Sequence, residues 1–171
     1  MTAFSAESAT LHVLAFREGV LSAVGHDLLL RATRFSAELS EDKSRLKVRC
    51  DAASLVVETA MRDGRPLPDA FSAADVRKIE RSTREEVLEA SRYPEILFET
   101  RSIDPAGTFT GTLDLHGRAR ELSGRWHLSD GRLEGELAID QPAFGVRPFT
   151  AMLGALKVRR EVVARLVLPV A

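Results

Sequence analysis

The sequence predicts a mainly β fold, an eight-stranded antiparallel lipocalin-like β-barrel with an inserted α-helical segment. Short runs of alternating polarity recur along most of the chain, with Gly, Pro and Asp-Gly turn signals between them, which is typical of barrels and sandwiches. One central segment breaks the alternation and has helix-start signatures instead. No linker or low-complexity tract divides the 171 residues, so we expect residues 1–171 to form a single domain.

The expected strands are short runs in which apolar and polar residues alternate, as in a strand with one buried face. They cover residues 10–16, 21–31, 35–39, 46–50, 54–57, 96–103, 109–116, 121–128, 133–139 and 162–168.

The expected helical insertion covers about residues 72–91. Ser72 and Ser82 each precede an acidic residue, Asp75 and Glu85, by three positions, which is the pattern of a capping box at a helix start. The segment therefore forms one bent helix or two short ones, and Tyr93-Pro94 ends it.

Two turns allow the register of three consecutive strands to be predicted. A two-residue loop at 117–118 sets Leu113 opposite Leu122, Gly111 opposite Gly124 and Phe109 opposite Trp126. The Asp130-Gly131 pair is a strong type I′ hairpin signal, and it sets Trp126 opposite Gly135. Both registers place the apolar residues on one face and pair Arg125 with Glu136 and His127 with Glu134 on the other.

Three glycines, Gly111, Gly124 and Gly135, surround Trp126 on this inner face, although glycine weakens a strand. Two compatible interpretations stay open. The glycines let the sheet bend, with Trp126 covering their backbone, or they widen an apolar cavity with Trp126 as one wall. A barrel of eight strands is wide enough to hold one small ligand.

The His26-Asp27 pair sets two titratable groups in an otherwise apolar strand. One interpretation is a structural polar cluster, and the other is contact with a ligand headgroup at the mouth of the barrel. The segment 141–157 is too apolar for an ordinary loop, because it contains Phe144, Phe149 and Met152 beside Arg147. It either plugs one end of the barrel or forms a lip that admits ligand.

Composition excludes several classes of protein. The 24 basic and 25 acidic residues are spread along the chain, which argues against nucleic-acid binding. The single Cys50 cannot form an internal disulfide, and the four histidines lack metal-ligand spacing.

We find no transmembrane run and no signal peptide at the start of the sequence, so we expect a cytoplasmic protein. No Gly-x-Ser-x-Gly nucleophile motif is present.

Five features in this order resemble the YceI-like proteins: residues 25–27 (Gly-His-Asp), the strand at Ser54-Leu55 followed by a long loop, 93–98 (Tyr-Pro-Glu-Ile-Leu-Phe), 111–117 (Gly-Thr-Leu-Asp-Leu-His-Gly) and 144–146 (Phe-Gly-Val). The resemblance covers nearly the whole chain. It implies a lipocalin-like eight-stranded barrel with an inserted helix and a tunnel for a long isoprenoid or other amphiphile. It also implies that Gly25 to Asp27, Phe98 and Phe144 are functionally important positions, without a catalytic role for any of them. Such proteins are usually exported to the periplasm. This sequence differs from them in showing no visible signal peptide, which is why we expect a cytoplasmic location.

We therefore expect a carrier for an apolar amphiphile, isoprenoid or quinone-like, with no cofactor other than a bound isoprenoid, quinone or fatty-acid-like ligand. Two alternatives stay open: an enzyme with His26 and Asp27 as acid and base, and a packed barrel that binds a protein through its helical insertion or residues 144–153. A homodimer is compatible with the sequence. The expected ligand-binding residues are His26, Asp27, Phe98, Gly111, Gly124, Trp126, Gly135, Phe144, Arg147, Phe149 and Met152.

Overall fold

The computed structural model describes residues 1–18, 26–151 and 156–170. Its strands are β1 (Thr2–Ser5), β2 (Thr10–Glu18), β3 (Asp27–Ala32), β4 (Phe35–Leu39), β5 (Leu46–Asp51), β6 (Leu55–Arg62), β7 (Arg65–Leu67), β8 (Glu95–Asp104), β9 (Thr108–Leu115), β10 (Arg118–Ser129), β11 (Arg132–Asp140), β12 (Thr150–Ala151) and β13 (Leu156–Pro169). The helix is α1 (Ala73–Ser82), which continues into a π-helical turn, η2 (Thr83–Val87).

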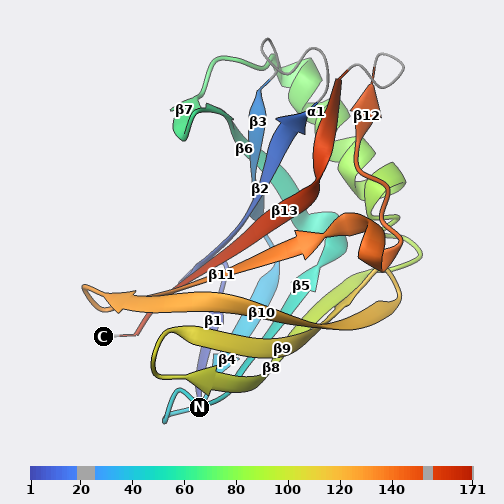
Figure 1. Ribbon diagram of the computed structural model, residues 1–171. Helices are drawn as coiled ribbons and strands as arrows, with labels where there is room; N and C mark the ends of the chain where they lie inside the picture. Colours follow the sequence, from blue (N-terminus) through green and yellow to red (C-terminus); the bar gives the residue numbers. More distant parts are fainter. Residues whose placement is uncertain (19–25, 152–155, 171) are drawn as a thin grey trace.

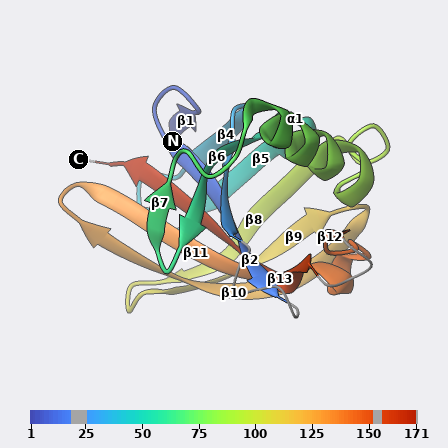
Figure 2. The same ribbon diagram turned by 90° about the horizontal axis from the view of Figure 1, so that it is seen from above.

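The strands form one antiparallel sheet that is curled into a half-barrel (Figure 1). The hydrogen-bonded path is β1-β4-β5-β8-β9-β10-β11-β13-β2-β3-β6-β7, and β12 pairs with β13 beside it. Seen from above, α1 lies on the opposite side of the molecule from β10 and β11 (Figure 2). The sheet and the helix thus enclose a common interior.

The predicted count of eight strands is wrong, and the described residues do not show a closed barrel. Within the described ranges the path holds twelve strands, and no pairing joins its two ends, β1 and β7. The strands that the sequence did not indicate, β1, β7 and β12, have four, three and two residues. Runs this short show no clear alternation of polarity. Their backbone groups are hydrogen-bonded to a neighbouring strand, and the side-chain pattern does not reveal this.

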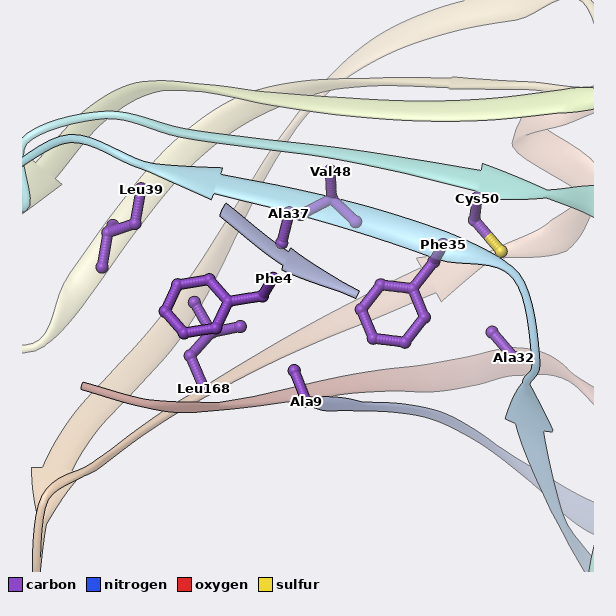
Figure 3. Close-up of a cluster of buried hydrophobic side chains, with 9 residues drawn as sticks. All are labelled: Phe4, Ala9, Ala32, Phe35, Ala37, Leu39, Val48, Cys50 and Leu168. Atoms are coloured by element: carbon purple, nitrogen blue, oxygen red, sulfur yellow. The ribbon is translucent and has the colours of Figure 1, made fainter. Parts of the chain in front are cut away.

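Alternation in β4 and β5 builds the first part of the core. In β4, Phe35, Ala37 and Leu39 are buried while Ser36 and Glu38 are exposed, as expected for a strand with one face inward. These side chains pack with Phe4 of β1 and with buried side chains of neighbouring segments (Figure 3). The full cluster is Phe4, Ala9, Ala32, Phe35, Ala37, Leu39, Val48, Cys50 and Leu168.

A second buried cluster lies where β9 and β11 meet the segment after β11. A 3-10 turn, η3 (Gln141–Phe144), ends at Gly145, whose φ of +74° is the left-handed conformation that glycine adopts without strain. The side chains of Phe144 and Val146 are thereby buried against Leu113 and Leu137. Gln141, Phe144 and Val146 of this segment are therefore part of the buried interior.

Only the first of the two expected helix starts is used. Ser72 accepts a hydrogen bond from the Asp75 amide, and the Asp75 carboxylate accepts one from the Ser72 amide, which completes the capping box. Ser82 has helical dihedral angles and makes no capping bond, and Thr83 donates its hydroxyl proton to the carbonyl of Ile79 instead. The insertion is therefore one continuous helix with a π-helical end.

The two hairpins had different outcomes. The β10–β11 register is confirmed, since Trp126 lies opposite Gly135 and His127 opposite Glu134 around the Asp130-Gly131 turn. The predicted β9–β10 register is wrong by two residues: Leu122 lies opposite Gly111, and Gly124 lies opposite Phe109.

The turn residues explain this shift. The β9–β10 turn is made by His116 and Gly117, with φ of +56° and +76°, as a type I′ turn requires at both central positions. Histidine is an unusual residue for such a turn, so the sequence favoured the following pair. Because the slip is two residues, every side chain stays on its predicted face.

Candidate functional site

The interior of the half-barrel contains a cavity of about 710 Å³. The inward residues of β2, β3, β8, β9, β11 and β13 line it, together with the facing side of α1 and η2. Because side chains alternate along each strand, every second residue faces this space. In β2 these are Leu11, Val13 and Ala15, and in β3 they are Leu28 and Leu30.

Several of these inward side chains are only half-buried, although they point away from the outer surface. Val13, Leu28, Leu133 and Leu166 are examples. In a packed core such residues would be covered by their neighbours. Here they face open volume, which removes the basis for a solid, packed barrel.

The three glycines around Trp126 have different roles. Gly135 lines the cavity, and a Cβ built on it would meet a single atom within 4 Å, Cε1 of Phe109 at 3.9 Å. The positions beside Gly111 and Gly124 are occupied, by the ring of Phe98 in the first case and by that of Phe109 in the second. Gly135 thus supports the cavity interpretation, whereas Gly111 and Gly124 provide close packing for two aromatic rings.

Trp126 is one wall of the cavity. Its indole Nε1 donates a hydrogen bond to the carbonyl oxygen of Asp104 at 3.0 Å. The polar group of the ring is therefore satisfied by the protein backbone. The apolar part of the indole is left to face the interior.

The structure separates His26 from Asp27. The Asp27 carboxylate accepts hydrogen bonds from the backbone amide of Arg17 at 2.8 Å and pairs with its guanidinium at 3.2 Å. Asp27 does not line the cavity, whereas His26 does. Gly25, which precedes them, lies outside the described residues.

The remaining predicted site residues fall into three groups. Phe98 and Phe149 line the cavity. Phe144 is fully buried behind the cavity wall, and Arg147 is exposed. Met152 lies outside the described residues. Gln141 and Val146 line the cavity together with Phe149, so the described part of residues 141–157 leaves both the plug and the lip interpretation open.

The sequence did not indicate the part of the cavity that the insertion provides. Phe71, Ile79 and Val87 line it, and Lys78 and Asp75 add charged groups. Val76, Ile79 and Val87 partly keep a helical spacing in the sequence, but an apolar helix face of this kind covers a packed sheet as readily as a cavity.

Cys50 also lines the cavity, and the sequence did not indicate this. Its thiol is buried, and this burial raises its pKa to about 11, against a weaker lowering by a hydrogen bond with Ser54. A thiol with so high a pKa stays protonated at neutral pH and behaves as a small apolar group.

The described part of the chain offers neither a place for a metal ion nor a membrane-spanning helix. Residues 1–18, 26–151 and 156–170 contain no group of three or more His, Cys, Asp or Glu side chains arranged to hold a metal ion. In the same ranges we find no helix with the length and apolar character to cross a membrane.

Comparison with known proteins adds a family and a fold. A family model described as a YceI-like domain matches residues 12–168. The crystal structure of Burkholderia cenocepacia BcnA is similar, with a TM-score of 0.61, 18% identity and 94% of each chain covered. A polyisoprenoid-binding domain from Saccharophagus degradans has a TM-score of 0.56 and 15% identity, with 97% of this chain and 94% of that one covered. No curated protein sequence matches this chain.

Proposed function

Since this chain belongs to the family of YceI-like domains, we propose that it binds a long apolar amphiphile, isoprenoid or quinone-like, inside its half-barrel and carries it. The observation that supports the proposal most directly is the apolar cavity of about 710 Å³. Ligand sites in proteins have about 300–1,000 Å³ and are lined mainly by hydrophobic and aromatic side chains.

The energy of burial is sufficient for such a ligand. Each buried CH₂ group contributes on the order of 0.8 kcal/mol, so a dozen buried carbons would contribute about 10 kcal/mol before the costs of binding are subtracted. Most of this energy needs no polar contact, which agrees with the leucine and valine side chains of β2, β3 and β13 that line the cavity.

The similar fold of the polyisoprenoid-binding domain from Saccharophagus degradans supports an isoprenoid chain as the apolar part of the ligand. An isoprenoid or quinone tail is long, branched and flexible. Such a chain can adapt to a cavity whose walls come from both the sheet and α1, as the lining residues of this half-barrel do.

The two alternatives have less support. An acid–base pair needs both groups at the substrate, but Asp27 is paired with Arg17 and does not line the cavity. A packed barrel that serves as a protein-binding module needs a filled interior, whereas this interior has a large open volume.

The experiment that tests the proposal is extraction of the purified protein with organic solvent, followed by mass spectrometry of the extract. The protein is then titrated with geranylgeraniol and a short-chain ubiquinone while tryptophan fluorescence is recorded. Trp126 is the only tryptophan in the chain and lines the cavity, so ligand entry changes its emission directly. Absence of an extractable lipid together with an unchanged emission would contradict the proposal.

A further inference from the structure

His26 is the polar end of an apolar row. His26 immediately precedes β3 and lines the cavity together with Leu28 and Leu30 of that strand, while Asp27 and Leu29 do not line it. The two inward positions beyond His26 in the strand are leucines. A chain lying along this row would therefore meet hydrocarbon first and an imidazole at its end.

The imidazole has an unused hydrogen-bonding atom. Its Nδ1 is buried, and within the described ranges it has no hydrogen-bond partner. Buried polar atoms in folded proteins are nearly always paired, and an unpaired one needs an explanation such as an absent ligand or water. The obvious neighbour does not serve, because the carboxylate of Asp27 is held by Arg17.

The ring is also positioned from the helical insertion. Phe71, which lies just before α1, packs edge-to-face against His26 with ring centroids 5.7 Å apart. Phe71 and Ile79 line the same cavity. The aromatic and aliphatic groups around His26 are accompanied in the cavity lining by Arg17, which is paired with Asp27, and by Asp75 and Lys78 of α1.

From these contacts we propose that His26 is the specificity-determining residue of the cavity, and that its Nδ1 binds the terminal hydroxyl group of the amphiphile. The inference rests on the proposed function and names the class of ligand, a long-chain alcohol. A hydroxyl group both donates and accepts a hydrogen bond, so it pairs with Nδ1 in either tautomer of the imidazole. An anionic head at a buried nitrogen would have to give up its hydration at a large cost, which favours an uncharged head.

The test compares three ligands with the same tail: geranylgeraniol, its methyl ether and the corresponding hydrocarbon without oxygen. Their affinities are measured by Trp126 fluorescence for wild type and for His26→Phe, which keeps a ring and loses the nitrogen. Wild type binds the alcohol about tenfold more tightly than the hydrocarbon, as expected for one hydrogen bond at a buried group. His26→Phe loses this preference and keeps its affinity for the hydrocarbon.

Two further variants sharpen the comparison. His26→Asn retains a polar atom close to the position of Nδ1 and restores part of the preference for the alcohol. His127→Phe makes the same exchange at an exposed histidine that pairs with Glu134, and it leaves the preference unchanged. If His26→Phe still prefers the alcohol, or if wild type binds alcohol and hydrocarbon equally well, the inference is wrong while the proposed function stands. If wild type binds none of the three, the inference is wrong, and the proposed function is wrong as well when solvent extraction yields no lipid and the ubiquinone leaves the emission unchanged.

A measurement on wild type covers the case in which His26→Phe does not fold. In long-range ¹H–¹⁵N spectra, geranylgeraniol shifts the Nδ1 resonance of His26, and the hydrocarbon shifts it far less. Equal shifts with both ligands would overturn the inference.

Discussion

The ring of Phe98 occupies the space in which a side chain at position 111 would lie. A Cβ built on Gly111 would be 2.5 Å from Cζ of Phe98 and 2.6 Å from the carbonyl oxygen of Glu99. Real Cβ atoms do not approach neighbours so closely, and one of the two contacts is with backbone that cannot rotate away. Glycine at this position therefore serves the packing of β8 against β9, next to the cavity but not in its wall.

The first prediction follows from this contact and compares two glycines. Gly111→Ala lowers the free energy of unfolding by about 1–3 kcal/mol, because an overpacked site forces side chains and backbone to move. Gly135→Ala changes it by less than about 0.5 kcal/mol, since the new methyl group meets only an ordinary contact with Phe109. Urea unfolding of the two variants checks the difference, and equal losses would contradict the description of the two sites.

The second prediction concerns the volume of the cavity. Gly135→Leu adds a side chain that points into the open space opposite Trp126. It lowers the affinity for a long-chain amphiphile at least about tenfold, because the new carbons occupy volume that the ligand needs. The control is Ala138→Leu on the exposed face of the same strand, which leaves affinity unchanged. A Gly135→Leu protein that binds as tightly as wild type would show that the ligand does not use this part of the interior.

Two sequence signatures that are far apart in the chain meet outside the cavity. The ring centroids of Tyr93 and His116 lie 4.2 Å apart, and Nε2 of His116 is 2.6 Å from a carboxylate oxygen of Glu89. A Cβ on Gly117 would be 2.8 Å from the Tyr93 ring. The first residue of the Tyr-Pro motif thus packs on the last two residues of the motif that ends in His-Gly. This joins the segment after the helix to the β9–β10 turn.

The third prediction uses Gly117 and a matched glycine. Gly117 and Gly64 have nearly equal positive φ angles, +76° and +78°, but no atom lies within 4 Å of a Cβ built on Gly64. Gly64→Ala therefore measures the cost of the left-handed conformation alone, about 1 kcal/mol. Gly117→Ala costs more, because the methyl group also displaces Tyr93. Unfolding curves of the two variants give the difference, and equal costs would mean that the Tyr93 contact adds nothing to stability.

The sequence predicts a feature of this fold correctly when residues close to it in the chain determine that feature. It fails when residues distant in the chain do so. The Asp130-Gly131 turn and the Ser72 capping box are set by neighbouring residues, and both were predicted correctly. The His116-Gly117 turn depends on a histidine in a left-handed conformation that Tyr93 and Glu89 surround. That environment exists only after the chain has folded, so the register was predicted two residues away.

In the candidate site, too, local features were predicted and contacts between strands distant in the chain were not. Alternation of polarity indicated which residues of β10 and β11 face inward, including Trp126 and Gly135. It could not indicate that Phe98 and Phe109 fill the space beside the other two glycines, because the filling residue lies on a neighbouring strand. Nor could it show that α1 covers a cavity, since an apolar helix face has the same spacing above a packed sheet and above an open one.

The last prediction concerns pH and Cys50. Burial raises the pKa of this thiol to about 11 from an ordinary value of 9.0, so the folded protein keeps its proton at pH values where the unfolded chain has lost it. The contribution of the thiol to stability is therefore complete below pH 9 and is lost as pH rises to about 11. At 1.36 kcal/mol for each pKa unit, the loss is on the order of 2–3 kcal/mol.

The measurement is the free energy of unfolding of wild type and Cys50→Ala between pH 7 and pH 11, with reducing agent present. Lysine and tyrosine side chains titrate in both proteins, so their contributions cancel in the difference between the two curves. That difference stays constant up to about pH 9 and then shrinks by the expected amount, because only wild type has a thiol to ionise. A difference that stays constant up to pH 11 would show that the Cys50 thiol ionises as easily in the folded protein as in the unfolded chain.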